Sequence, residues 1–190
     1  MDKILKMATA TILTAGMLSA SEYNVDNAHS NVGFSVKHMM VANVHGNFTS
    51  YEAVLDFDEK TKTFKKLIAN IDTKSVNTGI NDRDDHLRSD DFFATESFPK
   101  MIFEMTSYKA DKDDLDEGKM KGNLTIRGIT KPVTLEAEDI AVLGNKLGFV
   151  LEGKINRKDF GLTWNKAIEL GGVVVGDIVK IKVDIEATKK

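Results

Sequence analysis

Four histidines are the residues of this chain best suited to acid–base or metal chemistry: His29, His38, His45 and His86. Their separations of nine, seven and forty-one residues match no short metal-binding motif such as His-Glu-x-x-His. Cysteine is absent, which excludes thiolate nucleophiles, zinc–thiolate sites and disulfides. The sequence therefore predicts no metal site, although a fold can still bring distant histidines together.

The segment Arg83–His86 is a second place where chemistry is conceivable, because an imidazole beside a carboxylate can act as a general acid or base. The structural interpretation is that Asp82 or Asp84 caps a short helix, which Arg83 and His86 attach to its surroundings. We favour the structural interpretation, because the chain contains no Gly-x-Ser-x-Gly elbow, phosphate loop or dinucleotide fingerprint. No catalytic residue is predicted, and a lipid-modifying enzyme is the weakest functional hypothesis.

Acidic side chains are concentrated between Asp111 and Glu117. A calcium-binding loop needs its oxygen ligands at a set spacing, and this run lacks that spacing. We therefore predict a solvated hairpin tip.

The composition is that of one soluble globular domain. The chain has 190 residues, of which 42% are hydrophobic and 29% charged, and neither a disordered nor a polytopic membrane protein has this balance. The net charge of -3 gives no reason to expect binding to a phosphate backbone. Nucleic acid is not an expected partner.

The N-terminus has the pattern of a secretory signal peptide. Lys3 and Lys6 precede an uncharged, largely apolar run, 7–18, and the small residues 19–21 follow. Cleavage after Ala20 or Ser21 would leave a mature domain, 22–190, in a bacterial periplasm or outside the cell, without a membrane anchor. The alternative is a buried N-terminal helix.

Alternation of apolar and polar residues dominates the rest of the chain. Val32, Phe34 and Val36 share one face of a predicted strand, and His38 falls on the same face. Similar patterns, separated by turn residues such as Gly144-Asn145, indicate further strands. These strands cover 51–57, 66–73, 101–108, 119–127, 133–141, 147–155 and 179–187.

Strands with one apolar face predict an all-β sandwich or closed antiparallel barrel, because closure pairs every edge and turns the apolar faces inward. Only 82–91 breaks the alternation, which indicates a short helix or crossover. A barrel of about eight strands can be packed solid or can enclose one elongated ligand. The large inward residues Phe34, Phe48, Phe103 and Phe149 suit either interior, so both alternatives stay open.

Seven segments along the chain resemble the YceI-like family of bacterial lipid- and polyisoprenoid-binding proteins, and together they extend from about Tyr23 to Ile185. The segments are Tyr23–His38, Ser75–Thr78, Arg83–Phe93, Phe98–Phe103, Gly122–Lys131, Ile155–Gly161 and Val173–Val183. The resemblance implies an extended, lipocalin-like antiparallel β-barrel of about eight strands that is secreted to the periplasm and is often a homodimer. It also implies a long isoprenoid or fatty-acyl amphiphile inside the barrel, with no other cofactor.

One departure from the family is Asn47, at a position that commonly carries a basic residue. No contact with a ligand head group is assigned there.

The candidate ligand contacts are inward-facing strand residues, together with apolar residues near the expected helix and barrel ends. His38 is either a structural histidine with a buried hydrogen-bond partner or a contact for the polar end of a ligand. Trp164 is either a barrel-end aromatic or a contact at the mouth. The full set is Phe34, Val36, His38, Phe48, Leu87, Phe92, Phe103, Leu124, Ile126, Phe149, Phe160 and Trp164.

Overall fold

The computed structural model describes residues 20–167 and 174–190. The predicted signal peptide therefore lies, up to residue 19, outside the described residues. Antiparallel strands dominate the described chain, as the alternating patterns predict. They are β1 (Ser21–Val25), β2 (Asn31–His38), β3 (Ala42–Phe48), β4 (Tyr51–Asp58), β5 (Thr63–Asp72), β6 (Val76–Asn77), β7 (Lys100–Ala110), β8 (Gly118–Ile126), β9 (Ile129–Leu143), β10 (Lys146–Asn156) and β11 (Val175–Lys189).

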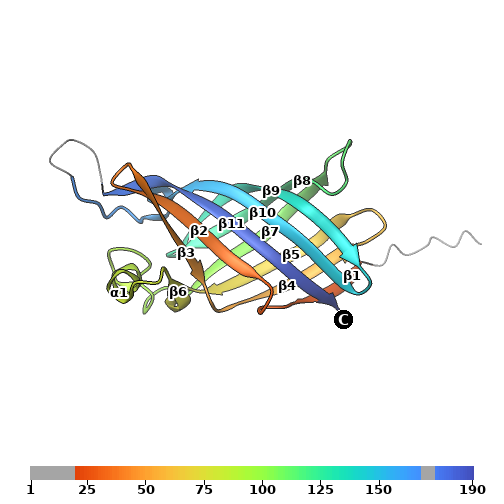
Figure 1. Ribbon diagram of the computed structural model, residues 1–190, viewed down its shortest axis with the longest axis horizontal. Coiled ribbons are helices and arrows are strands. Elements are labelled where there is room, and N and C mark those ends of the chain that lie inside the picture. Colours follow the sequence, from red (N-terminus) through yellow and green to blue (C-terminus); the bar gives the residue numbers. More distant parts are fainter. Residues whose placement is uncertain (1–19, 168–173) are drawn as a thin grey trace, which may run out of the picture.

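Eight of these strands close into a barrel in the order β1-β4-β5-β7-β8-β9-β10-β11, because β11 also pairs with β1. At the closing seam Tyr23 of β1 lies opposite Lys189 of β11. On the other edge of β11, Ile185 lies opposite Phe149 of β10. The predicted all-β antiparallel barrel of about eight strands, with one short helix, is confirmed (Figure 1).

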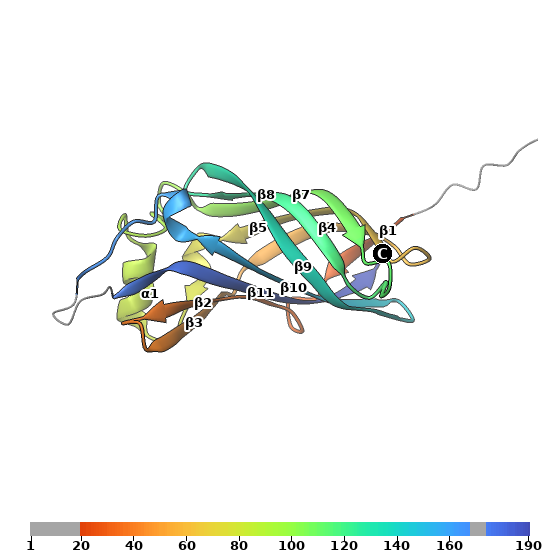
Figure 2. The ribbon, with the colours of Figure 1, turned by 90° about the horizontal axis from the view of Figure 1, so that it is seen from above.

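β11 has a different neighbour at each end of the barrel. Its C-terminal part pairs with β1, whereas its earlier part pairs with β2, where Val183 lies opposite Val32. β2 continues through β3 to β6, which extends the sheet at the end where α1 (Asn81–Arg88) lies. Figure 2 shows α1 and the β2–β3 hairpin together at this end, opposite the C-terminus.

The helix α1 is held in a different way from the predicted cap. Its N-cap residue, Ile80, makes no side-chain capping hydrogen bond. Asp84 instead accepts a hydrogen bond from the backbone N–H of Thr78 at 2.8 Å, and the Nε of Arg83 donates to Oγ1 of Thr78 at 2.7 Å. The expectation that Asp82 or Asp84 caps the helix is wrong, because the carboxylate of Asp84 bonds to the loop before the helix.

The other irregular segments are two short 3-10 helices, η1 (Thr73–Ser75) and η2 (Arg157–Phe160). The acidic run from Asp111 forms the connection between β7 and β8, as predicted. Gly144, in the predicted β9–β10 turn, has φ +61°, a left-handed conformation that glycine adopts without strain. Within the described ranges, no helix has the length and apolar character needed to cross a membrane.

Candidate ligand-binding cavity

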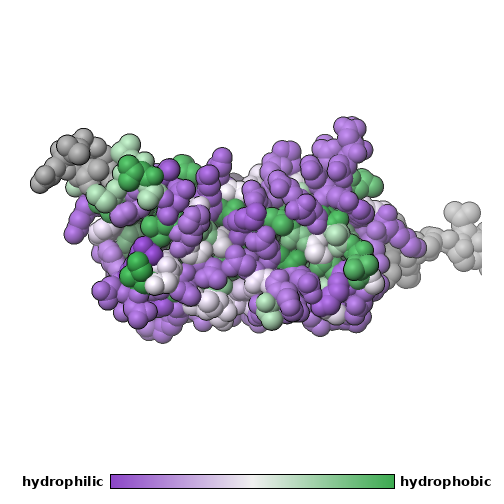
Figure 3. All heavy atoms as spheres, viewed as in Figure 1, coloured by the Kyte–Doolittle hydropathy of each residue, from purple (hydrophilic) through white to green (hydrophobic). Residues whose placement is uncertain are grey.

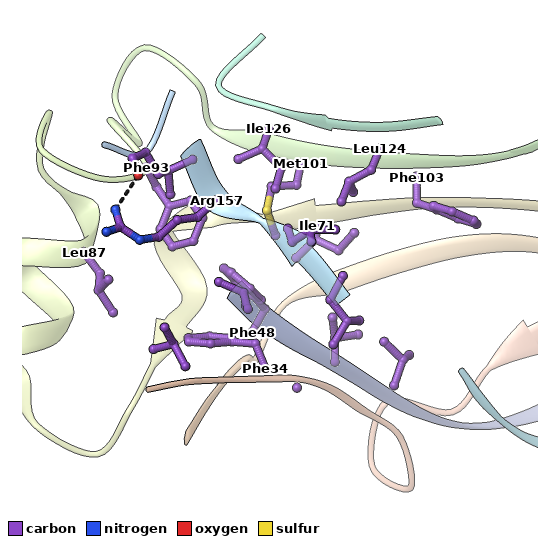
Figure 4. A pocket seen from close by; sticks show the side chains of 18 of the residues that line it. Phe34, Phe48, Ile71, Leu87, Phe93, Met101, Phe103, Leu124, Ile126 and Arg157 are labelled. Carbon is purple, nitrogen blue, oxygen red and sulfur yellow. Dashed lines mark hydrogen bonds between the residues drawn. The ribbon is translucent and has the colours of Figure 1, made fainter. Parts of the chain in front are cut away.

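A cavity of about 350 Å³ lies inside the barrel, and its wall is almost entirely apolar. The wall is built from strands around the barrel, including Ile71 of β5, Met101 of β7 and Leu124 of β8, and it is completed by Leu87 of α1. Figure 4 shows these side chains around one open space. A barrel packed solid would have no such space, so the open interior favours the ligand-binding alternative.

The structure brings eleven of the twelve predicted contact residues to the wall. They are Phe34, Val36, His38, Phe48, Leu87, Phe92, Phe103, Leu124, Ile126, Phe149 and Trp164. Phe160 is the exception, since it is the last residue of η2 and its side chain packs in the core with 1% exposure. Contact between these residues and a ligand stays a prediction.

The inward row of β2 depends on a glycine in the neighbouring strand. Phe34 lies opposite Gly46 of β3, and a Cβ atom at Gly46 would come within 2.5 Å of the Phe34 ring. The glycine therefore leaves the space that this ring occupies. The ring also packs against Phe48, with 5.7 Å between the ring centroids.

Aromatic rings close the cavity on the side away from α1. Phe149 lines the cavity, and its ring packs edge-on against Phe64 with 4.9 Å between centroids. Phe64 makes contacts of the same kind and distance with Phe57 and Tyr108. Burial raises the pKa of the Tyr108 hydroxyl to about 12. Phe149 thus forms the floor of the cavity, where the cavity meets a packed cluster of aromatic rings.

Apart from Tyr51, the titratable side chains on the described part of the wall are all basic: Lys37, His38, Arg83, His86 and Arg157. Within residues 20–167 and 174–190, no carboxylate lines the cavity. His86 has a partner, because its Nε2 lies 2.9 Å from Asp91. Of this basic set, His38 and Arg83 can donate hydrogen bonds to the polar end of a guest molecule, whereas the guanidinium of Arg157 already donates to the protein.

His38 ends the inward row of β2. A structural role would require a buried hydrogen-bond partner for its imidazole. No side-chain hydrogen bond or ion pair involves His38 in the part of the chain that the structure describes. The unpartnered ring favours the head-group interpretation. Asn47, by contrast, lies off the wall and donates from Nδ2 to Oδ1 of Asn31 at 3.1 Å.

Arg157 is the lining residue with the most hydrogen bonds, and the sequence reasoning did not select it. Its guanidinium donates to the backbone carbonyls of Leu162, Trp164, Val175 and Gly176, and its side chain is only 4% exposed. Burial lowers the pKa of this guanidinium, an effect that the nearby carboxylate of Asp177 opposes. Arg157 therefore joins the segment after η2 to the start of β11. Its only signal in the sequence was its place in a family-like segment.

One cluster of potential metal ligands also forms outside the cavity. Asp26, His29 and Glu186 place three ligand atoms within 4.8 Å of one another. The ammonium of Lys146 is 2.7 Å from Glu186 and 3.7 Å from Asp26, so the cluster already contains a cation. The hydrogen bond to Asp26 raises the pKa of the His29 imidazole. We assign the cluster as a surface ion-pair network. Its members cannot be grouped from the sequence, because Glu186 of β11 is far along the chain from Asp26 and His29.

Fold and site together define a β-barrel with an apolar internal cavity and a basic margin. Comparison with known proteins identifies the family: the YceI-like domain matches residues 23–187, so this chain belongs to the YceI-like family. Protein YceI of Salmonella newport is 40% identical over 159 residues, which are 80% of this chain and 82% of that protein.

Solved structures show the same fold. The chain is similar to a Campylobacter jejuni YCEI protein, with 42% identity, a TM-score of 0.70, and coverage of 87% of this chain and 96% of that one. A polyisoprenoid binding domain from Saccharophagus degradans has a TM-score of 0.64 over 90% of this chain and 100% of that chain. At 14% identity, this second likeness is one of fold.

Proposed function

We propose that the protein is a non-catalytic binding protein that holds one long-chain amphiphile, either an isoprenoid or a fatty-acyl lipid, in the barrel cavity. The observation that carries the proposal is the apolar cavity of about 350 Å³. Its single basic margin gives the guest a direction, with the apolar chain toward Phe149 and the polar end near His38 and Arg83. The fold shared with a polyisoprenoid binding domain supports the same class of ligand.

The apolar wall can supply the binding energy without an ion pair. Burial of a methylene group stabilises a complex by about 0.8 kcal/mol, so roughly sixteen methylenes contribute about 13 kcal/mol before ordering costs. A micromolar dissociation constant requires about 8 kcal/mol net. Burial of the ligand's hydrocarbon chain alone is therefore sufficient for micromolar binding.

Extraction of the protein purified from its own host, followed by mass spectrometry, tests this proposal. We expect an isoprenoid or long-acyl lipid in the organic phase, at up to one molecule per chain. Delipidated protein should then take up a fluorescent fatty acid or a prenol. A clean extract, together with no uptake of either probe, would show that the proposal is wrong.

Phe149 should set the length of the bound chain, because it forms the cavity floor. The substitution Phe149→Leu removes ring volume where the cavity meets Phe64 and leaves the position apolar. We expect the preferred acyl chain to become longer by about one methylene. The affinity for the longer acid, relative to the acid one methylene shorter, should then rise roughly fourfold. Competition between saturated fatty acids of increasing length measures this change. Leu147→Val, a substitution at a buried core position of β10 off the cavity wall, is the control and should leave the length preference unchanged.

A cellular role is proposed from the predicted signal peptide and the family resemblance. We infer that the mature protein acts in the periplasm after signal cleavage and carries or stores its lipid there. Homodimer formation remains a prediction from the family resemblance, and light scattering that shows a stable monomer at micromolar concentration would contradict it.

A further inference from the structure

The turn between β2 and β3 exposes three consecutive large apolar residues. Met39, Met40 and Val41 are 43%, 64% and 82% exposed, respectively. Single exposed apolar residues are ordinary on protein surfaces, but an uninterrupted run at a hairpin tip is a feature of interaction sites. In Figure 3, which has the view of Figure 1, green hydrophobic spheres lie at the upper left, where Figure 1 shows the β2–β3 hairpin.

The backbone of this turn is also unfavourable for the residues that occupy it. The N–H of Val41 donates to the carbonyl of His38 at 3.2 Å, which closes a β-turn with Met39 and Met40 at its two central positions. Met39 has φ 47° and Met40 has φ 62°, so both central residues are left-handed. Such turns favour Asn-Gly, because residues with a larger side chain are strained there. Stability of the fold therefore does not explain a Met-Met pair at this position.

The tip stands beside the cavity. His38 directly precedes it and lines the cavity wall, as does Val174, whose carbonyl accepts a hydrogen bond from the N–H of Met39 at 2.8 Å. Figures 1 and 2 place the β2–β3 hairpin at the α1 end of the barrel. A surface that contacts the tip would therefore lie next to this end of the cavity.

Basic side chains flank the apolar tip. Lys37 precedes it on β2, and Lys166 is adjacent through the hydrogen bond from the N–H of Val174 to the Lys166 carbonyl. Both side chains are exposed, and neither forms an ion pair with any residue in the ranges 20–167 and 174–190. The ammonium of Lys166 lies 5.8 Å from the ring centroid of Trp164. Apolar residues with Lys and Trp beside them are the side chains that favour an anionic membrane interface.

We propose that the β2–β3 tip docks on the surface of an anionic lipid bilayer, with Met39, Met40 and Val41 in the boundary between head groups and acyl chains. Lys37 and Lys166 then face the anionic head groups. Docking brings this end of the cavity to the membrane, where a lipid can enter or leave the barrel. The inference goes beyond the proposed function, since it assigns an exposed surface and names the bilayer as its partner.

The double substitution Met39→Asn with Met40→Gly tests this inference without endangering the fold. Asn-Gly suits the left-handed turn, so the melting temperature should stay the same or rise. Flotation with vesicles of phosphatidylethanolamine and phosphatidylglycerol should show that the mature wild-type protein binds and that the double variant binds at least about tenfold more weakly. Leu143→Ser is the matched control, because Leu143 is 84% exposed but is the last residue of β9, at the opposite end of the barrel. This control should bind vesicles like the wild type.

Further measurements separate the outcomes. Wild-type binding should weaken in vesicles of phosphatidylcholine alone and in high salt. The double variant should bind a monomeric fluorescent fatty acid with an unchanged dissociation constant but acquire lipid from vesicles more slowly. Absence of wild-type binding to anionic vesicles, or equal binding by the double variant, would overturn the inference while leaving the cavity proposal intact. Loss of a dimer in the double variant, without vesicle binding by the wild type, would assign the tip to a second copy instead and would also overturn it.

Discussion

Replacing Phe34 with Asp should abolish retention of a long-chain ligand. The ring of Phe34 lies on the cavity wall, packs against Phe48 and fills the space over Gly46. An ionised carboxylate there would have no partner among the apolar residues around it, at a cost of several kcal/mol. We expect binding of a fluorescent fatty acid to fall by more than a hundredfold, or the domain to unfold.

Two further variants distinguish loss of binding from loss of folding. Val54→Asp introduces the same charge on β4 at a position that is 45% exposed and off the cavity wall. It should leave both affinity and melting temperature nearly unchanged. Phe34→Leu keeps the wall apolar and should fold, with a modest loss of affinity from the smaller side chain. If Phe34→Asp stays folded and retains its lipid, Phe34 does not face the ligand.

Loss of Arg157 should strongly destabilise the fold. Arg157→Met preserves an apolar stem of similar length but leaves the buried carbonyl of Leu162, and those of Trp164, Val175 and Gly176, without this donor. Since each unsatisfied buried polar group costs about 1–3 kcal/mol, we expect a loss of at least about 3 kcal/mol. For a domain of this size, that corresponds to roughly 6–12 °C in melting temperature.

Lys158→Met is the control for loss of a positive charge beside Asp177, separate from loss of the hydrogen bonds to the carbonyls. Lys158 contacts the same carboxylate, that of Asp177, at 2.9 Å, but its side chain is 46% exposed. Its removal should therefore cost less than about 1 kcal/mol. Thermal denaturation of the two variants measures the difference. Equal losses would mean that the ion pair with Asp177, and not the four carbonyls, accounts for the contribution of Arg157.

The strands and their inward-facing residues could be predicted from the sequence, because the local alternation of apolar and polar residues agrees with the tertiary contacts. The apolar faces of β2, β8 and β11 are visible in the sequence because alternation places every second side chain on one side of a strand. The same alternation predicted that Phe34, Leu124 and Phe149 face inward, and all three line the cavity. The family-like segments then pointed to a barrel with about eight strands. For these features, local sequence and final fold agree.

The sequence by itself therefore determined an all-β barrel of the YceI-like family, and most of the side chains that face its interior. Only the tertiary structure decided where the interior is hollow, because Phe64 and Phe149 meet across strands that are far apart in the chain. It also decided that Arg157 joins two segments through their carbonyls, and that Asp84 bonds to Thr78 and not to the helix end. Period-two patterns report which face of a strand is buried, but the depth of a cavity and the partner of a buried charge depend on which strands become neighbours.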